Sequence, residues 1–189
     1  RFEPTGSFSQ AFAFAGGLFI VTPSGRPAST YTHETGHIFW ARDEYPNSGS
    51  HNDKRGYYNT QNTNAIDDAP PGFIQQPSIM SSGLLLQQAY NNNTSPEPTF
   101  AQIGWQDSDG DGIFDVLDVP LDLDVAAVVE PGSQLLRVRG TASAVPLLNL
   151  NSSGQQNDIT LNRVSRIEYR IDGGDWVTAS TPDAQTVLV

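Results

Sequence analysis

The chain has no cysteine, one methionine and one lysine among its 189 residues. Without cysteine it cannot form a disulfide, act through a thiol or bind zinc or iron through thiolates. The apolar run around residues 17–21 is far shorter than the roughly 20 residues that a membrane-spanning helix needs. The sequence therefore predicts no membrane span, and other means, such as metal ions, would have to brace the fold.

Positive charge is also scarce. Ten Lys and Arg residues stand against 21 Asp and Glu residues, which gives a formal net charge of -11. Because affinity for nucleic acids is built from clustered Lys and Arg, this balance argues against a nucleic-acid partner, and acidic membrane surfaces are disfavoured for the same reason. The acidic surplus is better suited to binding cations.

Turn-forming residues are abundant, with 17 Gly and 13 Pro, which argues for short strands and against a helical bundle. The predicted elements of the N-terminal part are two strands within 8–22 broken at Gly16 and Gly17, a helix that Ser29 or Thr30 caps and that runs to Ala41, a polar loop over 43–78, and a short helix over 95–105 with Ser or Thr caps. The C-terminal part is predicted to form strands within 125–129, 134–142, 166–172 and 176–179. Gly173 and Gly174 predict a hairpin turn. We therefore expect an α+β domain over 1–106, an acidic connector over 107–118 and an all-β module over 119–189.

Residues 33–45 read HETGHIFWARDEY and contain the pattern H-E-x-x-H. On a helix, His33 and His37 lie one turn apart on the same face, so both imidazoles can bind one metal ion, while Glu34 can polarise a water molecule beside them. Catalytic zinc takes three protein ligands, and the third is Asp43 or Glu44. Because Glu44 would lie roughly 10 Å beyond His37 on an unbroken helix, the chain must turn sharply after His37.

This segment resembles the metzincin peptidases, whose pattern is H-E-x-x-H-x-x-G-x-x-H/D. In that register Asp43 stands at the third-ligand position, and Trp40 replaces the usual glycine, the residue that allows a left-handed backbone. The ending D-E-Y also resembles the immune inhibitor A type of secreted bacterial metallopeptidase and leaves Asp43 and Glu44 as alternatives. The resemblance implies the C-terminal part of a zincin fold with an active-site helix, a zinc cofactor and a polypeptide substrate, which would pair along a sheet edge near 18–22. Since only about 28 residues precede the helix, we expect the N-terminal part of the catalytic domain to be missing.

A second resemblance to the metzincins lies in SIMSSG, residues 78–83, which is similar to the Met-turn beneath their zinc site. It implies that Met80, the only methionine, forms an apolar floor under the ligand histidines. Many metzincins have a tyrosine two residues after this methionine, where this chain has Ser82. The residues that can replace it as donors to the reaction intermediate are Tyr31, Tyr45, Tyr57 and Tyr58, and His51 is expected to be a solvated loop histidine.

The segment DSDGDGIFDVLD, residues 107–118, fits a calcium-binding loop position by position. Its expected ligands are Asp107, Asp109, Asp111, the Ile113 carbonyl, Asp115 and Asp118, with Gly112 at the tight turn. Position 12 is Asp instead of the longer Glu, which predicts lower affinity or fewer ligand atoms. The loop resembles those of dockerins and thrombospondin type-3 repeats, where calcium is structural.

The C-terminal part resembles the immunoglobulin-like modules of secreted bacterial enzymes, which implies an all-β sandwich used for spacing, adhesion or self-association. Taken together, these features predict a secreted or cell-surface, prokaryotic zinc endopeptidase stabilised by calcium. The alternative is a non-catalytic, calcium-braced surface, filament or adhesion protein that keeps a peptidase-like scaffold.

Overall fold

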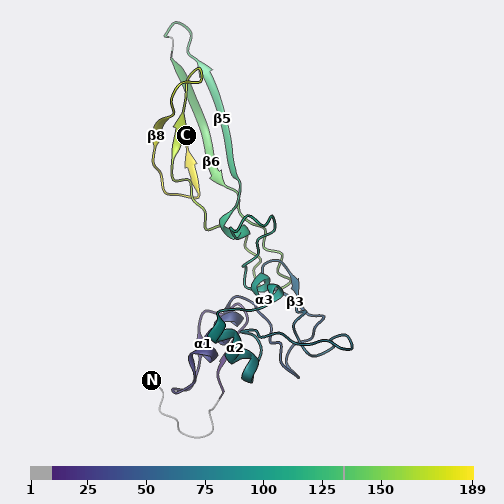
Figure 1. Cartoon of the computed structure of the whole chain (residues 1–189). Helices are drawn as coiled ribbons and strands as arrows, with labels where there is room; N and C mark the ends of the chain where they lie inside the picture. Colours follow the sequence, from purple (N-terminus) through teal and green to yellow (C-terminus); the bar gives the residue numbers. More distant parts are fainter. Residues whose placement is uncertain (1–9, 134) are drawn as a thin grey trace. The chain divides into compact units, whose positions relative to one another are not determined.

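The structure is a computed structural model that describes residues 10–133 and 135–189 (Figure 1). It divides into two compact units, the first formed by Arg1–Gln106 with Leu148–Asn157 and the second by Asp107–Leu147 with Asp158–Val189. Residues 8 and 9 of the first predicted strand and Gln134 of a later one lie outside the described residues. The segment 148–157, which the sequence analysis assigned to the β module, packs with the first unit.

The first unit combines three helices with two small hairpins among its described residues. Its elements are β1 (Phe12–Ala13), β2 (Ile20–Val21), α1 (Ala28–Ile38), β3 (Lys54–Arg55), β4 (Thr60–Gln61), α2 (Gly83–Asn92) and α3 (Glu97–Gln102). β1 pairs with β2 and β3 with β4, both antiparallel. The predicted break at Gly16 is confirmed, because this residue turns the chain with a φ of 66°. Most of the long loop after α1 is irregular, as predicted.

The predicted cap of the histidine helix is wrong. α1 begins at Ala28, one residue before the first expected cap, and Pro27 occupies the N-cap without a side-chain hydrogen bond. Proline suits this place because its φ is fixed and it has no N–H to satisfy. α1 also ends at Ile38 rather than Ala41, and α3 likewise has Pro96 at its N-cap instead of the expected Ser or Thr.

The interior of the first unit is small and largely polar. Met80, Ala65 and Ala89 are fully buried, but so are several residues that carry hydrogen-bonding groups, namely Glu44, Asn62, Asn64, Ser78, Ser81, Thr99 and Gln102. Buried polar groups of this kind require partners, so the loops are held by side-chain hydrogen bonds more than by apolar packing. None of the helices in the described part of the chain is long and apolar enough to cross a membrane.

The described residues of the second unit form antiparallel strands and one short 3-10 turn, η1 (Asp115–Leu117). β5 (Leu121–Val129), β6 (Leu136–Ala144) and β9 (Thr186–Leu188) form one sheet in that order, and β7 (Ile167–Tyr169) pairs with β8 (Val177–Ser180). The predicted hairpin at Gly173 is confirmed, whereas β9 was not predicted. The observed architecture is therefore mixed, with few helices and several small antiparallel sheets.

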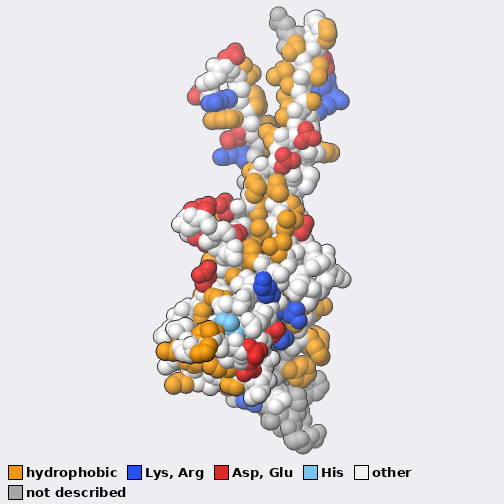
Figure 2. Space-filling model, turned by 90° about the vertical axis from the view of Figure 1, so that its right-hand side faces the viewer, with side chains coloured by type: hydrophobic (Ala, Val, Ile, Leu, Met, Phe, Trp, Pro, Cys, Tyr) orange, Lys and Arg blue, Asp and Glu red, His pale blue; other side chains and the backbone are white. Residues whose placement is uncertain are grey.

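Alternation along β5 and β6 gives their sheet one apolar and one polar face. Leu121, Leu123 and Val125 pair across the strands with Ala144, Ala142 and Gly140, while Asp122 and Asp124 face Ser143 and Thr141. The apolar face is only partly covered: Leu121 is 67% and Leu123 62% exposed, whereas their partners Ala144 and Ala142 are buried. Hydrophobic side chains, coloured orange, are visible on the part of the surface that the second unit forms (Figure 2).

Candidate metal centre

The chain reverses direction at the end of α1, which confirms the sharp turn expected after His37. The Ala41 N–H donates to the Gly36 carbonyl at 3.0 Å and the Trp40 N–H to the His37 carbonyl at 2.9 Å, the two bonds of a Schellman motif. Trp40 has the left-handed φ of 73° that this motif needs. Because such a backbone costs a residue other than glycine about 1–2 kcal/mol, other contacts must offset the strain. The turn brings Asp43 back to the histidines.

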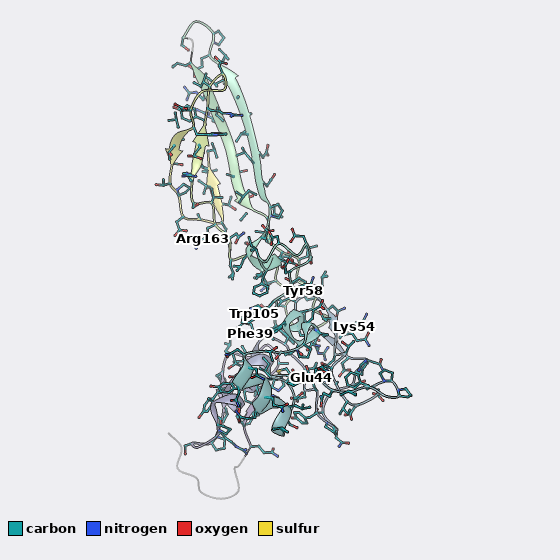
Figure 3. The ribbon with its side chains drawn as sticks, in the orientation of Figure 1. Phe39, Glu44, Lys54, Tyr58, Trp105 and Arg163 are labelled. Atoms are coloured by element: carbon teal, nitrogen blue, oxygen red, sulfur yellow. The ribbon has the colours of Figure 1, made fainter. Side chains whose placement is uncertain are left out.

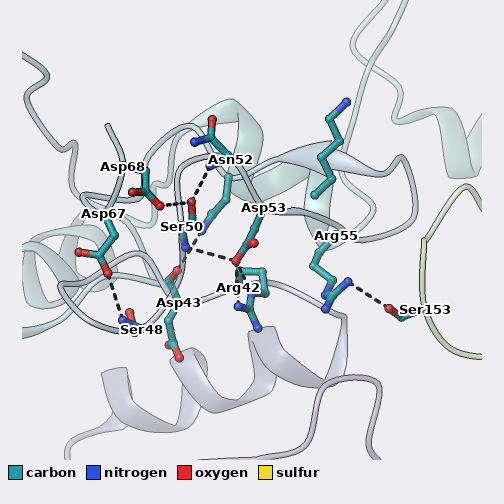
Figure 4. A network of polar contacts seen from close by, with 12 residues as sticks. Arg42, Asp43, Ser48, Ser50, Asn52, Asp53, Arg55, Asp67, Asp68 and Ser153 are labelled. Carbon is teal, nitrogen blue, oxygen red and sulfur yellow. Dashed lines mark hydrogen bonds and ion pairs between the residues drawn. The ribbon is translucent and has the colours of Figure 1, made fainter. Parts of the chain in front are cut away.

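The side chains of His33, His37 and Asp43 meet at one point. His33 Nε2 lies 3.1 Å and His37 Nε2 3.2 Å from the same oxygen, Oδ1 of Asp43. The two imidazole rings are nearly perpendicular, with an interplanar angle of 87° and centroids 4.9 Å apart. Figure 4 shows the Asp43 side chain pointing from its loop towards the helix. Among the described residues, only this group brings histidine and carboxylate ligand atoms within reach of one metal ion.

Hydrogen bonds at the other ring nitrogens fix the tautomer that each histidine adopts when its ring is neutral. His33 Nδ1 lies 2.8 Å from the Ile79 carbonyl oxygen, and His37 Nδ1 lies 2.9 Å from that of Ala41. Because a carbonyl only accepts, Nδ1 carries the hydrogen, and Nε2 of each neutral ring keeps a lone pair. Asp43 Oδ1 is buried and has no hydrogen-bond partner. Three lone pairs therefore converge, an arrangement that a cation stabilises and that is typical of oriented histidine ligands.

The charges of the three residues depend on one another. Burial alone would raise the pKa of Asp43, but the His33 and His37 rings beside it hold this pKa well below its ordinary value. Burial alone would lower the pKa of His37, but the Asp43 carboxylate outweighs burial and raises it. Asp43 is therefore ionised at neutral pH. Its carboxylate favours a proton on His37, and a bound cation would take the place of that proton.

Glu44, the alternative third ligand, lies in the interior of the first unit, where its carboxylate is bound by residues other than the histidines. Figure 3 labels its position. Its side chain is 1% exposed. Thr99 Oγ1 donates to Oε1 at 2.5 Å, Asn64 Nδ2 donates to Oε2 at 2.6 Å, and Ser81 Oγ lies 3.3 Å from Oε2. Burial raises the pKa of Glu44 despite these bonds. The geometry therefore favours Asp43 as the ligand and gives Glu44 a structural part, because its carboxylate ties three segments together.

Glu34 and Tyr45 lie next to the convergent group. Glu34 is 6% exposed. Burial raises its pKa, while the two histidines and a hydrogen bond from the Ala13 backbone counteract the rise. The Tyr45 ring centroid lies 6.1 Å from that of His33, and burial together with the Asp43 carboxylate raises the pKa of Tyr45 to about 12. Its phenol therefore keeps its proton at neutral pH, and it lies beside His33 and Asp43, where it can donate that proton in a hydrogen bond.

A cleft of about 520 Å³ opens beside these residues. It is lined by His33, Glu34, Tyr45 and Ser82, among others. A second hollow of about 570 Å³ lies along α1 but contains neither histidine nor Glu34, and Tyr31, Phe39 and Trp105 are among its lining residues. His51 lines neither of these hollows. Its ring packs against Phe73, with the ring centroids 5.3 Å apart.

Met80 supports the helix that carries the histidines. It is fully buried, and its backbone carbonyl accepts the Glu44 N–H at 3.0 Å. Its sulfur lies against Gly36 so closely that a Cβ added to Gly36 would be 2.4 Å from Sδ. The neighbouring Ile79 supplies the carbonyl that orients His33. The 78–83 segment thus contacts α1 at Gly36 and orients His33.

Substituting Gly36→Ala is expected to lower the free energy of unfolding by about 1–3 kcal/mol, because the new methyl group overpacks the contact with Met80. Thermal unfolding followed by circular dichroism measures the effect. Thr35→Ala, on the exposed side of the same helix, is the matched control and should change stability by less than about 0.5 kcal/mol. Equal stability of Gly36→Ala and the parent would show that Met80 does not support the helix tightly.

The loop after Asp43 is held by a polar network (Figure 4). Arg42 Nη2 forms an ion pair with Asp53 Oδ2 at 2.8 Å. Asp67 Oδ2 accepts the backbone N–H groups of Asn47 at 2.6 Å and Ser48 at 3.3 Å. Since Arg42 precedes Asp43 directly, this network restrains the chain immediately next to the convergent group.

In the second unit, Asp107, Asp109 and Asp111 bring their carboxylates together. Asp107 accepts the N–H groups of Gly110 at 2.7 Å and Gly112 at 2.9 Å. The Gly112 bond is the main cause that lowers the pKa of Asp107. The loop is thus shaped by its own carboxylates, and its first three predicted ligands lie within reach of one cation.

The other predicted calcium ligands lie outside that group. Asp115 instead accepts hydrogen bonds from the backbone N–H of Ser108 at 2.8 Å and from its hydroxyl at 2.7 Å. The Ile113 N–H donates to Asp111 at 2.8 Å, and Asp118 follows η1. The part of Ile113, Asp115 and Asp118 in binding a cation stays a prediction.

Comparisons with protein-family models, with curated proteins and with solved structures find no match for this chain. Any assignment of function therefore rests on the residues of the site and on their geometry.

Proposed function

We propose that the chain belongs to a zinc-dependent endopeptidase of the metzincin type, in which His33, His37 and Asp43 bind the zinc ion. The observation that carries the proposal is the convergence of three lone pairs, two of them on rings whose other nitrogens are already hydrogen-bonded. Two neutral imidazoles and one carboxylate form a ligand set that zinc accepts, and three protein ligands leave a position for water. Zinc bound there would acidify this water and polarise the scissile carbonyl.

Glu34 is the residue that we assign to proton transfer. It takes a proton from the attacking water as the new carbon–oxygen bond forms, and it passes this proton to the leaving nitrogen as the carbon–nitrogen bond breaks. Its raised pKa suits a group that must both accept and release a proton. We assign to Tyr45, which keeps its phenolic proton and lies beside His33, the donation of a hydrogen bond to the oxyanion.

The substrate in this proposal is an extended polypeptide. The cleft lined by Glu34, Tyr45 and Ser82 offers a place for it beside the ligand residues. β2 has only one neighbour among the described strands, β1, so its other edge can pair with a substrate backbone as expected for 18–22. Zinc analysis of the dialysed protein tests the proposal together with hydrolysis of an unfolded polypeptide, and absence of bound zinc would refute it.

A second candidate function is that of a calcium-braced surface, filament or adhesion protein. The observation in its favour is the set of exposed apolar side chains on β5, such as Leu121 and Leu123, since apolar patches commonly mark association sites. It predicts oligomers without zinc, whereas the peptidase proposal requires zinc in any oligomeric state. In both cases the protein would act outside the cell or at its surface, where calcium is available.

We further propose that the loop at 107–118 binds calcium and stabilises the second unit. Excess calcium is then expected to raise the melting temperature over that in EGTA, because an ion that binds only the folded state stabilises it by about 2.7 kcal/mol at 100 times its Kd. Asp109→Asn should abolish most of the shift, whereas Asp122→Asn, which removes the same charge from β5, should retain it. Equal calcium shifts in the two variants would rule out the loop as the binding site.

A further inference from the structure

We propose that the segment 148–157 is a positioning element for the metal centre, because it holds the Trp40 side chain at the turn that delivers Asp43. The inference rests on the proposed zinc site. In sequence this segment interrupts the strands of the second unit, yet it packs with the first. The β part of the chain would then contribute directly to the geometry of the zinc ligands.

The segment is fixed to the first unit by several hydrogen bonds. The Leu150 N–H donates to the Tyr57 carbonyl at 2.7 Å. Arg55 Nη1 donates to the hydroxyl oxygens of Ser152 at 3.2 Å and Ser153 at 3.0 Å, and Figure 4 shows the second of these contacts. These bonds join the segment to β3 and to the residues that follow it.

In addition to these hydrogen bonds, Gly154 of the segment packs against the Trp40 indole. A Cβ added to Gly154 would lie 2.5 Å from Cζ2 of Trp40, and one added to Gly16 would lie 2.2 Å from the same atom. Gly16 is itself held by its N–H, which donates to the His37 carbonyl at 3.0 Å. The indole thus lies between two glycines from distant parts of the chain, and any side chain at either position would displace it.

The Trp40 side chain matters to the metal centre because of its backbone. Its left-handed conformation closes the Schellman motif, and the next residue, Ala41, supplies the carbonyl that orients His37. Asp43 follows two residues later, and Asn62 Nδ2 holds its carbonyl at 2.9 Å. Because tryptophan does not favour this backbone on its own, the packing of its indole between the glycines supplies the compensation, and loss of this packing frees the turn.

Gly154→Ala in the intact chain tests the inference, with Gly72→Ala as its control. Both glycines have similar left-handed φ values, 79° and 82°, but a Cβ at Gly72 meets nothing within 4 Å. Both variants therefore bear the same backbone penalty, and only Gly154→Ala displaces Trp40. We expect Gly154→Ala to weaken zinc binding about 10-fold or more, as changes to residues that orient metal ligands typically do, and to alter the visible spectrum of the cobalt-substituted protein. Gly72→Ala should match the parent in both.

A second pair of variants keeps the test decisive if Gly154→Ala does not fold. Arg55→Ala removes the bonds to Ser152 and Ser153 without touching Trp40, and Lys54→Ala removes the same charge from the adjacent, exposed position. Weaker zinc binding in Arg55→Ala alone supports the inference. If the parent binds zinc and Gly154→Ala and Arg55→Ala bind it equally well with an unchanged cobalt spectrum, the positioning role is wrong while the zinc site stands. If the parent binds no zinc, the proposed function itself fails.

Discussion

Asp43→Asn is expected to weaken zinc binding by more than about 100-fold, because loss of a ligand should exceed the 10-fold to 100-fold cost of changing a residue behind one. Asparagine has nearly the same shape but no negative charge, so it cannot balance the cation between His33 and His37. The change also removes the carboxylate that raises the pKa of His37. Titration of the metal-free protein with zinc, against a chelator of known affinity, measures the loss.

Glu44→Gln is the matched control for Asp43→Asn. It also removes one negative charge, from the residue next to Asp43. The Glu44 carboxylate, however, accepts hydrogen bonds from Thr99 and Asn64 rather than from the histidines. An amide in its place turns one acceptor into a donor, so we expect stability to fall by about 1–3 kcal/mol with the zinc affinity little changed. If instead Glu44→Gln lost zinc and Asp43→Asn retained it, the assignment of the third ligand would be reversed.

Glu34→Gln is expected to lower the rate of peptide hydrolysis by about 100-fold to 10,000-fold, the usual contribution of a general base. Glutamine fills the same space and still accepts the hydrogen bond from Ala13, but it cannot take a proton from water. Zinc should remain bound with unchanged stoichiometry. Steady-state hydrolysis of an internally quenched peptide, with zinc content determined on the same samples, separates loss of chemistry from loss of metal.

Gln87→Glu provides a control for the cleft, which Gln87 also lines. Because Gln87 has no assigned part in proton transfer, this change should affect KM more than kcat. Equal activity of Glu34→Gln and the parent would exclude Glu34 as the general base, even if zinc were present.

The sequence was most informative where the spacing of residues alone determines how their side chains must be arranged to bind a metal ion. The spacing of His33 and His37 required a shared helix face, and the distance to Asp43 required a sharp turn, both of which the structure contains. It did not decide between Asp43 and Glu44, because neighbouring residues at the end of a turn point in different directions. Only the positions of Thr99 and Asn64, which are far away in sequence, distinguish them.

Other features could not be predicted from local patterns. α2 begins at Gly83 and carries three consecutive leucines, of which Leu84 is 71% exposed. Consecutive apolar residues do not show the spacing of three to four residues by which a helix is predicted from sequence. The return of 148–157 to the first unit depends on contacts of Arg55 and Trp40 across about a hundred residues, and its own composition resembles an ordinary loop. Trp40 itself contradicts the local rule that glycine is preferred at a left-handed turn, and the reason lies in this distant contact.

The most direct test of the central claim is a crystal structure of the zinc-loaded chain with anomalous data collected at the zinc edge. We predict one strong anomalous peak at about 2.0–2.2 Å from Nε2 of His33, Nε2 of His37 and a carboxylate oxygen of Asp43, with the Glu44 carboxylate still bound to Thr99. A peak elsewhere, or none at these three residues in protein saturated with zinc, would contradict the account.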